Sequence, residues 1–384
     1  MSRLNMVIAD IDGYYACSLA KWITDNHSAL ISLEVYTKQD SVLEFLQSEG
    51  RKPDILLVSQ DFLEVCREEP CAKTTIILCP KGSMDKYPQY YCINKYQPAD
   101  VLFNQIIDYY SETCNDGGHL AKGSSKTKVV NIFAPQGASG KTTISLLLAH
   151  QLALLGHKTL YISFRSLNNT VLSFMQGTLA ENLHNSFSRL VYYVKQNKSN
   201  LAFKINSLIA KDRETSLCFL VPSHCSLELD ELTGSELASI ISEIKATGNF
   251  EYIITVSDSS ITQKSLSLLE SADIVLMPVK PDLHSIDRIA FFDRELKKIE
   301  SAHKIEVRSK IFIMLNNCSQ NSGNTDYPYP VLDSIPYLGN IEGAKYLFDK
   351  KVCNIMKPVA NKLIEQLGTG YSRGAENEYK YNYA

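Results

Sequence analysis

A glycine-rich turn between an apolar strand and an apolar helix constrains the fold of this chain more than any other feature. The turn reads GASGKTT (137–143), after VVNIFAP (129–135) and before ISLLLAHQLALL (144–155). A strand that passes through such a loop into a helix is typical of a phosphate-binding loop, because loop N–H groups and the positive helix end face a polyphosphate. The residues predicted to line the phosphates are Gly137, Ala138, Ser139, Gly140, Lys141, Thr142 and Thr143.

The chemistry of the loop predicts ATP or ADP with Mg²⁺ as the bound group. Lys141 is expected to contact the β and γ oxygens, and Thr142 is expected to hold Mg²⁺ through its hydroxyl. The full GxxxxGKS/T pattern has a glycine where this chain has Pro135, so the alternative is a turn that merely joins strand to helix. The apolar residues on both sides favour nucleotide binding.

Length and composition predict a cytosolic protein of two domains. A chain of 384 residues exceeds the size at which one core usually keeps growing. No apolar run is long enough to span a bilayer, and the amino terminus lacks a basic-then-apolar secretion signal. The ten Cys form no CxxC pair, which favours free thiols over a metal site, and a net charge of −3 gives no general attraction to nucleic acid.

Apolar periodicity stops in residues 111–128, where Gly, Ser, Asn and Lys accumulate as in flexible connectors. We therefore predict a first domain at 1–110, this linker, a second domain at 129–367 and a disordered tail at 368–384. Both domains are expected to be α/β, since apolar strands alternate with helical stretches. The strands are predicted near residues 5–9, 31–36, 55–58, 75–79, 90–93, 129–134, 159–164, 216–222, 251–256, 273–279 and 310–316. The helices predicted in the first domain cover residues 14–26, 41–48, 62–67 and 99–110.

The five strand–helix units of the first domain predict a small doubly wound, flavodoxin-like parallel sheet. Their order resembles the receiver domain of response regulators, which carries a phospho-accepting Asp after its third strand. That position holds Ser59, whose neutral hydroxyl is a far weaker nucleophile than a carboxylate. We therefore expect a docking domain that phosphorylation does not switch, in which Asp10 and Lys95 form a structural ion pair or Asp10 is a solvated carboxylate at a strand end. Two further receiver positions are held by Asp12 and Cys79.

Three segments of the second domain follow the loop in order: SADIVLMPVKPDLHSIDR (271–288), FIMLNNC (312–318) and SIPYLGNIEGAK (334–345). With the loop, they make the second domain resemble the MinD/ParA family of deviant-Walker ATPases over residues 128–365. The resemblance implies a P-loop α/β fold with a mostly parallel sheet and a homodimer that forms across the nucleotide. It also implies that Asn316 contacts the adenine edge and that Pro336 lies beside the base.

Several positions depart from the catalytic pattern of that family. Gln136 stands where the family has its signature Lys, and Ser163 and Arg165 stand where it usually has two Asp. Asp258 either serves the magnesium site or is a surface loop residue. Arg165 is expected to face solvent, and the alternative is that it pairs with phosphate. Because phosphoryl transfer needs a positioned water and a donor for the γ-phosphate oxygens, we expect weak ATPase activity at most and assign no catalytic residue.

The combination of the two domains is itself informative. A receiver-shaped domain without its phospho-acceptor, placed ahead of a MinD-like domain with an eroded catalytic set, resembles the TadZ/CpaE family of Flp (Tad) pilus assembly proteins. The resemblance implies a cytoplasmic scaffold at the inner face of the membrane that recruits pilus secretion proteins through its first domain. The alternatives are a ParA-like ATPase of DNA partition and a response-regulator-type signalling protein.

Two further segments bear on partners. The densest basic stretch, residues 295–310, interleaves Glu with Lys, which argues against a nucleic-acid partner. Residues 352–367 contain Pro358 and are expected to form a last helix that packs on the sheet. The alternative for this segment is an amphipathic helix that attaches the protein peripherally to a membrane.

Overall fold

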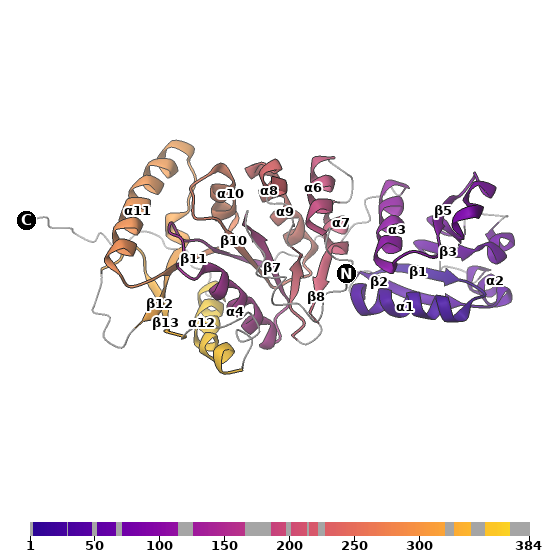
Figure 1. Cartoon of the computed structure of the whole chain (residues 1–384), viewed down its shortest axis with the longest axis horizontal. Helices are drawn as coiled ribbons and strands as arrows, with labels where there is room; N and C mark the ends of the chain where they lie inside the picture. Colours follow the sequence, from indigo (N-terminus) through magenta and orange to yellow (C-terminus); the bar gives the residue numbers. More distant parts are fainter. Residues whose placement is uncertain are drawn as a thin grey trace, which may run out of the picture. The chain divides into compact units, whose positions relative to one another are not determined.

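The computed structural model describes residues 3–28, 30–47, 52–66, 71–113, 126–165, 186–196, 201–212, 215–221, 227–318, 326–338 and 350–368. The chain divides into two compact units (Figure 1). The first comprises residues 1–125, 177–211 and 243–248, and the second comprises residues 126–176, 212–242 and 249–384. The predicted linker between 114 and 125 and the predicted tail from 369 onward lie outside the described residues.

A five-stranded parallel sheet of order β2-β1-β3-β4-β5 forms the centre of the first unit. Its strands are β1 (Leu4–Ala9), β2 (Ile31–Tyr36), β3 (Ile55–Ser59), β4 (Thr74–Cys79) and β5 (Tyr91–Asn94). The elements that follow these strands are α1 (Gly13–His27), α2 (Gln39–Gln47), η1 (Gln60–Cys66), η2 (Lys81–Lys86) and α3 (Ala99–Thr113). This strand order confirms the predicted doubly wound, flavodoxin-like sheet.

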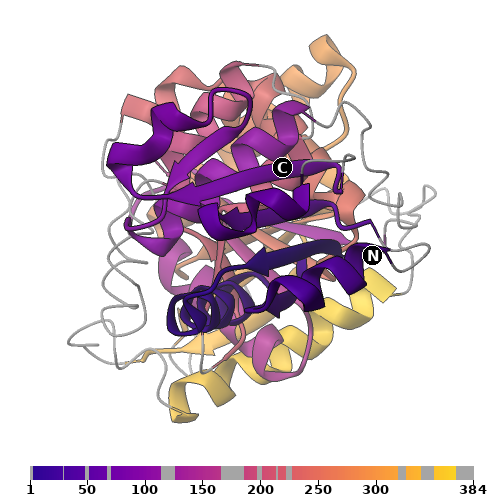
Figure 2. The same cartoon turned by 90° about the vertical axis from the view of Figure 1, so that its right-hand side faces the viewer.

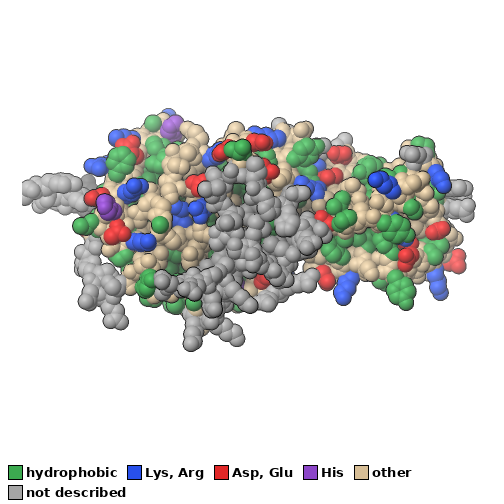
Figure 3. Space-filling view, viewed as in Figure 1, with side chains coloured by type: hydrophobic (Ala, Val, Ile, Leu, Met, Phe, Trp, Pro, Cys, Tyr) green, Lys and Arg blue, Asp and Glu red, His purple; other side chains and the backbone are tan. Residues whose placement is uncertain are grey.

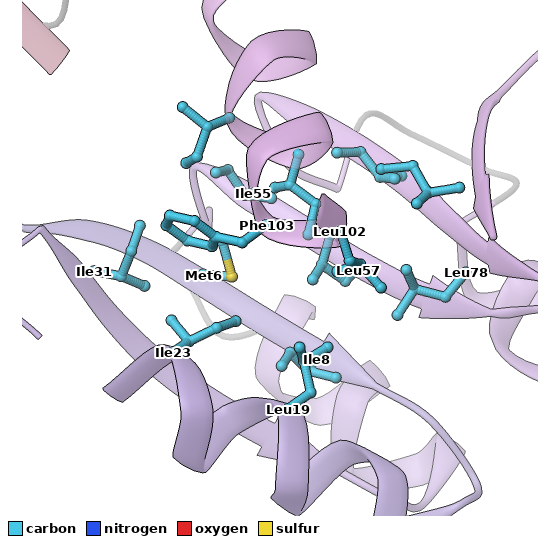
Figure 4. Packing of buried hydrophobic residues seen from close by; sticks show 14 of the residues in the cluster. Met6, Ile8, Leu19, Ile23, Ile31, Ile55, Leu57, Leu78, Leu102 and Phe103 are labelled. Carbon is cyan, nitrogen blue, oxygen red and sulfur yellow. The ribbon is translucent and has the colours of Figure 1, made fainter. Parts of the chain in front are cut away.

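Apolar side chains cover both faces of this sheet, because successive residues of a strand point to opposite sides. Met6 and Ile8 point toward α1 and α3, where Phe103 packs in the same cluster (Figure 4). Val7 and Ala9 point to the other face, which α2 and η1 close. Helices therefore lie on both faces of the sheet (Figures 1 and 2).

The second unit is built on a parallel sheet of order β13-β12-β11-β6-β10-β7-β9. Its strands are β6 (Lys128–Ile132), β7 (Thr159–Phe164), β9 (Cys218–Leu220), β10 (Tyr252–Ser257), β11 (Ile274–Val279), β12 (Ile311–Cys318) and β13 (Val331–Pro336). The short strand β8 (Ile209–Lys211) belongs to the residues of the first unit. The helical elements after residue 126 are α4 (Lys141–Leu154), α6 (Ser186–Lys195), α7 (Leu201–Ser207), α8 (Leu227–Glu231), α9 (Gly234–Thr247), α10 (Gln263–Ser271), α11 (Leu283–His303), η4 (Arg308–Lys310) and α12 (Lys350–Gly368). This mostly parallel α/β sheet agrees with the predicted fold class.

The structure differs from the predicted elements at η1, at β13 and at β8, a three-residue strand that was not predicted. The helix expected at 62–67 is the seven-residue 3₁₀ segment η1, since a stretch this short gains few hydrogen bonds for the cost of starting an α-helix. Strand β13 was not predicted as a strand. Only Leu332 and Ile335 of its six residues are buried, and it carries Asp333 and Ser334, so it lacks the continuous apolar run of the central strands.

The last helix, α12, packs against α4 and β13. Its buried residues recur every three or four positions along one face, and they are Cys353, Met356, Val359, Ala360, Leu363 and Leu367. Pro358 lies inside the helix on its exposed side. The packing role predicted for this segment is confirmed. Within the described ranges, no helix is both long and apolar enough to cross a bilayer.

Candidate functional site

The glycine-rich loop joins β6 to α4 at the carboxyl edge of the second sheet. Strand β6 lies between β11 and β10, near the middle of that sheet. Its neighbour β10 also pairs with β7, and Ser257 is in register with Phe164 at the ends of these two strands. The next residues, Asp258 and Arg165, therefore leave the sheet side by side next to the loop. Ligands of parallel α/β sheets bind beyond the carboxyl ends of central strands, so this edge is the candidate site.

The loop approaches strand β12 closely. Gly140 has φ +95°, in the left-handed region that favours glycine, and Ala138 has φ +54°. The side chain of Asn316 lies directly against Gly140, and its Nδ2 donates to the carbonyl oxygen of Ser139 at 2.9 Å. The glycine at position 140 thus serves two needs, a backbone angle and room for Asn316.

Replacing Gly140 by alanine is expected to lower the free energy of unfolding of the nucleotide-free protein by about 2–3 kcal/mol. The positive φ costs an L-residue roughly 1–2 kcal/mol, and the new Cβ overlaps Asn316 Nδ2, so the hydrogen bond to Ser139, worth about 1 kcal/mol, is lost as well. The matched control is Gly156→Ala, because Gly156 has φ +89° but nothing within 4 Å of the added Cβ. Equal losses in denaturant titrations of the two variants would show that the contact with Asn316 is unimportant.

Lys141 is buried in the loop. Its Nζ donates to the carbonyl oxygens of Ala134 at 3.4 Å and Gln136 at 3.3 Å, and to the hydroxyl of Ser259. Burial, and next the charge of Arg165, lower the pKa of Lys141 to about 8, while Asp258 acts in the opposite direction. The ammonium group is therefore held inside the loop in an environment that favours an additional negative charge.

Arg165 does not face solvent, contrary to the sequence prediction. Its Nη1 donates to the Thr142 hydroxyl, and its Nε lies 3.7 Å from Asp258 Oδ1. The prediction was wrong because β7 and β10 end in register, which places a carboxylate beside the arginine. The guanidinium thereby lies between Thr142 and Asp258, the two residues predicted for Mg²⁺.

The described residues of the site fit a polyphosphate. The hydroxyl of Ser139 and the Nε of Arg165 are buried without a hydrogen-bond partner, and Lys141 lies near both the loop carbonyls and Arg165. Buried donors normally have an acceptor, and the phosphate oxygens of a nucleotide would supply one. Mg²⁺ fits at Thr142 and Asp258 only if the guanidinium leaves them, since both cations use the same oxygens.

The groups that could assist hydrolysis are few. Nε2 of Gln136 donates to the Ser285 hydroxyl at 2.7 Å, so this side chain is engaged at the start of α11. The hydroxyl of Ser163 is buried without a partner at the end of β7. The nearest carboxylate in the described part of the site is Asp258, which faces Arg165. The arrangement can hold and neutralise phosphates, but the residues described at this site present no carboxylate free of a cation to orient an attacking water.

The two residues predicted beside the base lie on neighbouring strands. Asn316 of β12 is in register with Ile335 of β13, and Pro336 follows at the end of β13 with an exposed ring. In this structure the Asn316 amide nitrogen donates to the Ser139 carbonyl oxygen of the loop, as described above. Their role in adenine binding stays a prediction.

A second cluster lies in the first unit, at the carboxyl end of its sheet. Asp10 Oδ2 lies 2.7 Å from Lys95 Nζ, and both side chains are buried. The Tyr15 hydroxyl donates to the Lys95 carbonyl oxygen at 3.0 Å, and burial followed by the charge of Asp10 raises the pKa of Tyr15. Ser59 Oγ lies 3.5 Å from Asp61 Oδ2. The structural ion pair predicted for Asp10 and Lys95 is confirmed.

Two serines of the nucleotide site were missed by sequence reasoning. Ser259 accepts a hydrogen bond from Lys141 and donates to the Gln136 carbonyl oxygen at 3.1 Å. Ser285 accepts from Gln136 at the start of α11. The run SDSS after β10 could have pointed to Ser259, since several small polar residues follow a central strand there.

Comparisons with known proteins concern the second unit. The protein family described as an AAA domain matches residues 127–309. The septum site-determining protein MinD of Neisseria meningitidis is 29% identical over 166 residues, which are 42% of this chain and 58% of MinD. An uncharacterised protein of Methanocaldococcus jannaschii is 30% identical over 200 residues, which are 48% of this chain and 72% of that protein. The match to MinD thus spans little more than half of its length.

Among solved structures, a putative plasmid partition protein from Borrelia burgdorferi, bound to AMPPNP, is similar with a TM-score of 0.50. Its sequence identity is 17%, and the match covers 62% of this chain and 99% of that chain. At this identity the likeness shows the fold alone, a P-loop α/β domain.

Proposed function

The second part of this chain is a P-loop ATPase domain of the MinD/ParA family, and on that premise we propose that the protein binds ATP at the glycine-rich loop and forms a homodimer held by the nucleotide. One observation carries the proposal. Two cationic side chains, Lys141 and Arg165, lie at the loop together with the buried and unpartnered hydroxyl of Ser139. An anion with several oxygens would satisfy all three groups.

Slow or absent hydrolysis is part of the proposal. Gln136 is engaged with Ser285, and positions 163 and 165 carry a serine and an arginine in place of carboxylates. In phosphoryl transfer, one missing group that stabilises charge on the γ-phosphate can cost ~10³-fold or more. When bound, Mg²⁺ would neutralise phosphate charge, and Thr142 and Asp258 are the residues that would hold it. We therefore propose a scaffold that acts through its nucleotide-dependent dimerisation rather than through ATP hydrolysis.

The finer proposal is a role in Flp (Tad) pilus assembly. Its support is the order of the two parts, since a receiver-shaped fold with serine at the acceptor position precedes the ATPase domain. In this proposal the first unit recruits pilus assembly and secretion proteins, and the second unit sets the oligomeric state. The protein would act in the cytoplasm, at the inner face of the membrane.

The alternative of DNA partition finds little support on the described surface. Over α11, Lys and Arg side chains are interspersed with Asp and Glu on the face in view (Figure 3). Within this region Lys298 lies 2.7 Å from Glu295, and Arg308 lies 2.8 Å from Asp293. Because nonspecific DNA binding needs cations that are available to phosphates, these pairs argue against a DNA-binding face.

The test is the oligomeric mass of the full chain with ATP and Mg²⁺, with ADP, and without nucleotide, together with a measurement of phosphate release. We expect an ATP-dependent dimer with negligible release. The ADP sample is the control, since it lacks the γ-phosphate but keeps the base and sugar. A monomer in all three conditions, or brisk phosphate release, would contradict the proposed scaffold.

A further inference from the structure

Arg165 occupies the position that the sequence assigned to a divalent cation. The guanidinium contacts the Thr142 hydroxyl through Nη1, and its Nε lies 3.7 Å from the carboxylate of Asp258. The Arg165 side chain is 28% exposed, so most of it lies within the site. These two oxygens would otherwise be the natural ligands of Mg²⁺ beside the phosphates.

The sheet fixes this position. Residues 159–164 of β7 pair in parallel with 252–257 of β10, so Arg165 and Asp258 follow directly from the last residues in register. Thr142 lies in the first turn of α4, whose amino end opens toward the same edge. The contact therefore joins the ends of β7 and β10 and the start of α4. The main-chain pairing and the loop set the positions of these three elements, so the contact does not depend on a long side chain lying freely on an open surface.

The charges around the guanidinium favour a polyanion. Thr142, which accepts from Arg165, directly follows Lys141 in the loop, so two cationic side chains lie at the same place, and among the described residues of the site Asp258 is the carboxylate that faces them. Arg165 Nε is buried and makes no hydrogen bond. A guanidinium presents several donors in a planar fork that matches phosphate oxygens, so it can neutralise and orient a phosphate without a metal.

We propose that Arg165 supplies within the same chain much of the positive charge that Mg²⁺ would bring to the β- and γ-phosphates, so that ATP binding depends only weakly on Mg²⁺. This inference rests on the proposed function, namely that the loop binds ATP. It follows because the guanidinium lies against the Thr142 hydroxyl and near the Asp258 carboxylate, the two groups that would hold the metal. Two cations brought to the same two groups repel each other, so the arginine contact opposes metal binding there.

The test is the affinity of the full-length protein for a fluorescent ATP analogue, measured in excess Mg²⁺ and in EDTA. For the wild type, the two dissociation constants should agree within about tenfold. For Arg165→Gln, EDTA should weaken binding by at least about 30-fold, since removing one partner of a charge contact inside a binding site has an effect of that order. Arg165→Lys should restore part of the tolerance, because it keeps the charge but not the fork.

The matched control is Arg294→Gln, which removes the same charge from the exposed side of α11. Its response to EDTA should equal that of the wild type. A wild-type affinity that falls in EDTA as steeply as that of Arg165→Gln would overturn the inference and leave the proposed function intact. If the wild type binds no ATP analogue in either buffer, the proposed function fails, and the inference fails with it. Thermal unfolding without nucleotide shows whether each variant is folded.

Discussion

Replacing Lys141 by alanine is expected to weaken ATP binding by about 100-fold or more and to abolish the ATP-dependent dimer. The ammonium group is buried, so water screens its attraction to a phosphate only weakly. Losing one partner of such a charge contact costs roughly 2–5 kcal/mol, and each 1.4 kcal/mol corresponds to a tenfold change in affinity. Titration with a fluorescent ATP analogue measures the affinity, and the mass in ATP measures the dimer.

Two further variants separate loss of charge from loss of structure. Lys141→Met keeps the apolar part of the side chain, and it should lose ATP binding as the alanine variant does. Lys298→Ala removes an exposed lysine that pairs with Glu295, and it should bind ATP as the wild type does. Wild-type affinity in the Lys141→Ala protein would show that the glycine-rich loop is not the nucleotide site.

Removing one partner of the Asp10–Lys95 ion pair is expected to lower the free energy of unfolding of the first unit by roughly 3–5 kcal/mol. The exposed fractions of these side chains are 2% for Asp10 and 9% for Lys95, so Asp10→Asn leaves a buried ammonium group without its counter-charge. Replacing both residues, as in Asp10→Leu with Lys95→Met, should cost much less, because no charge is then left buried. Urea unfolding followed by the fluorescence of Trp22 measures the effect, since this single tryptophan of the chain lies in α1 and packs on the core of the same unit.

The same unit offers a matched control. Lys73 and Asp54 form an ion pair of 2.8 Å, nearly the length of the buried pair, but the lysine side chain is 54% exposed. Lys73→Met should therefore change the stability by less than about 1 kcal/mol. If Asp10→Asn and Lys73→Met had equally small effects, burial would not distinguish the two pairs, and the structural role assigned to Lys95 would be wrong.

The parallel sheets at the centre of both units could be predicted because their central strands are apolar at consecutive positions. All six residues of β11 and all five of β3 are buried, as a sheet covered on both faces requires. Strand β13 escaped prediction because only two of its six residues, Leu332 and Ile335, are buried. The 3₁₀ character of η1 also escaped it, since a short helical pattern does not by itself distinguish the two kinds of helix.

For the candidate site, the loop could be found from its motif, whereas the direction of Arg165 could not. A side chain that follows a strand turns either to solvent or toward the end of the neighbouring strand. The choice here depends on the register between β7 and β10, which brings Asp258 alongside, and register is a property of the pairing rather than of either segment alone. The hydrogen bond from Asn316 to Ser139 likewise joins positions far apart in the chain.

At position 59, where a receiver domain carries its phospho-accepting carboxylate, this chain has a hydroxyl, and Lys95 is paired with Asp10. If the proposed function holds, phosphorylation would not switch the first unit. The nucleotide bound at the glycine-rich loop of the second unit would then time the action of the protein. Such a protein would respond to the supply of adenine nucleotide rather than to an external stimulus. Its first unit would be a constant binding surface, and dimerisation would raise the local concentration of that surface for its partners.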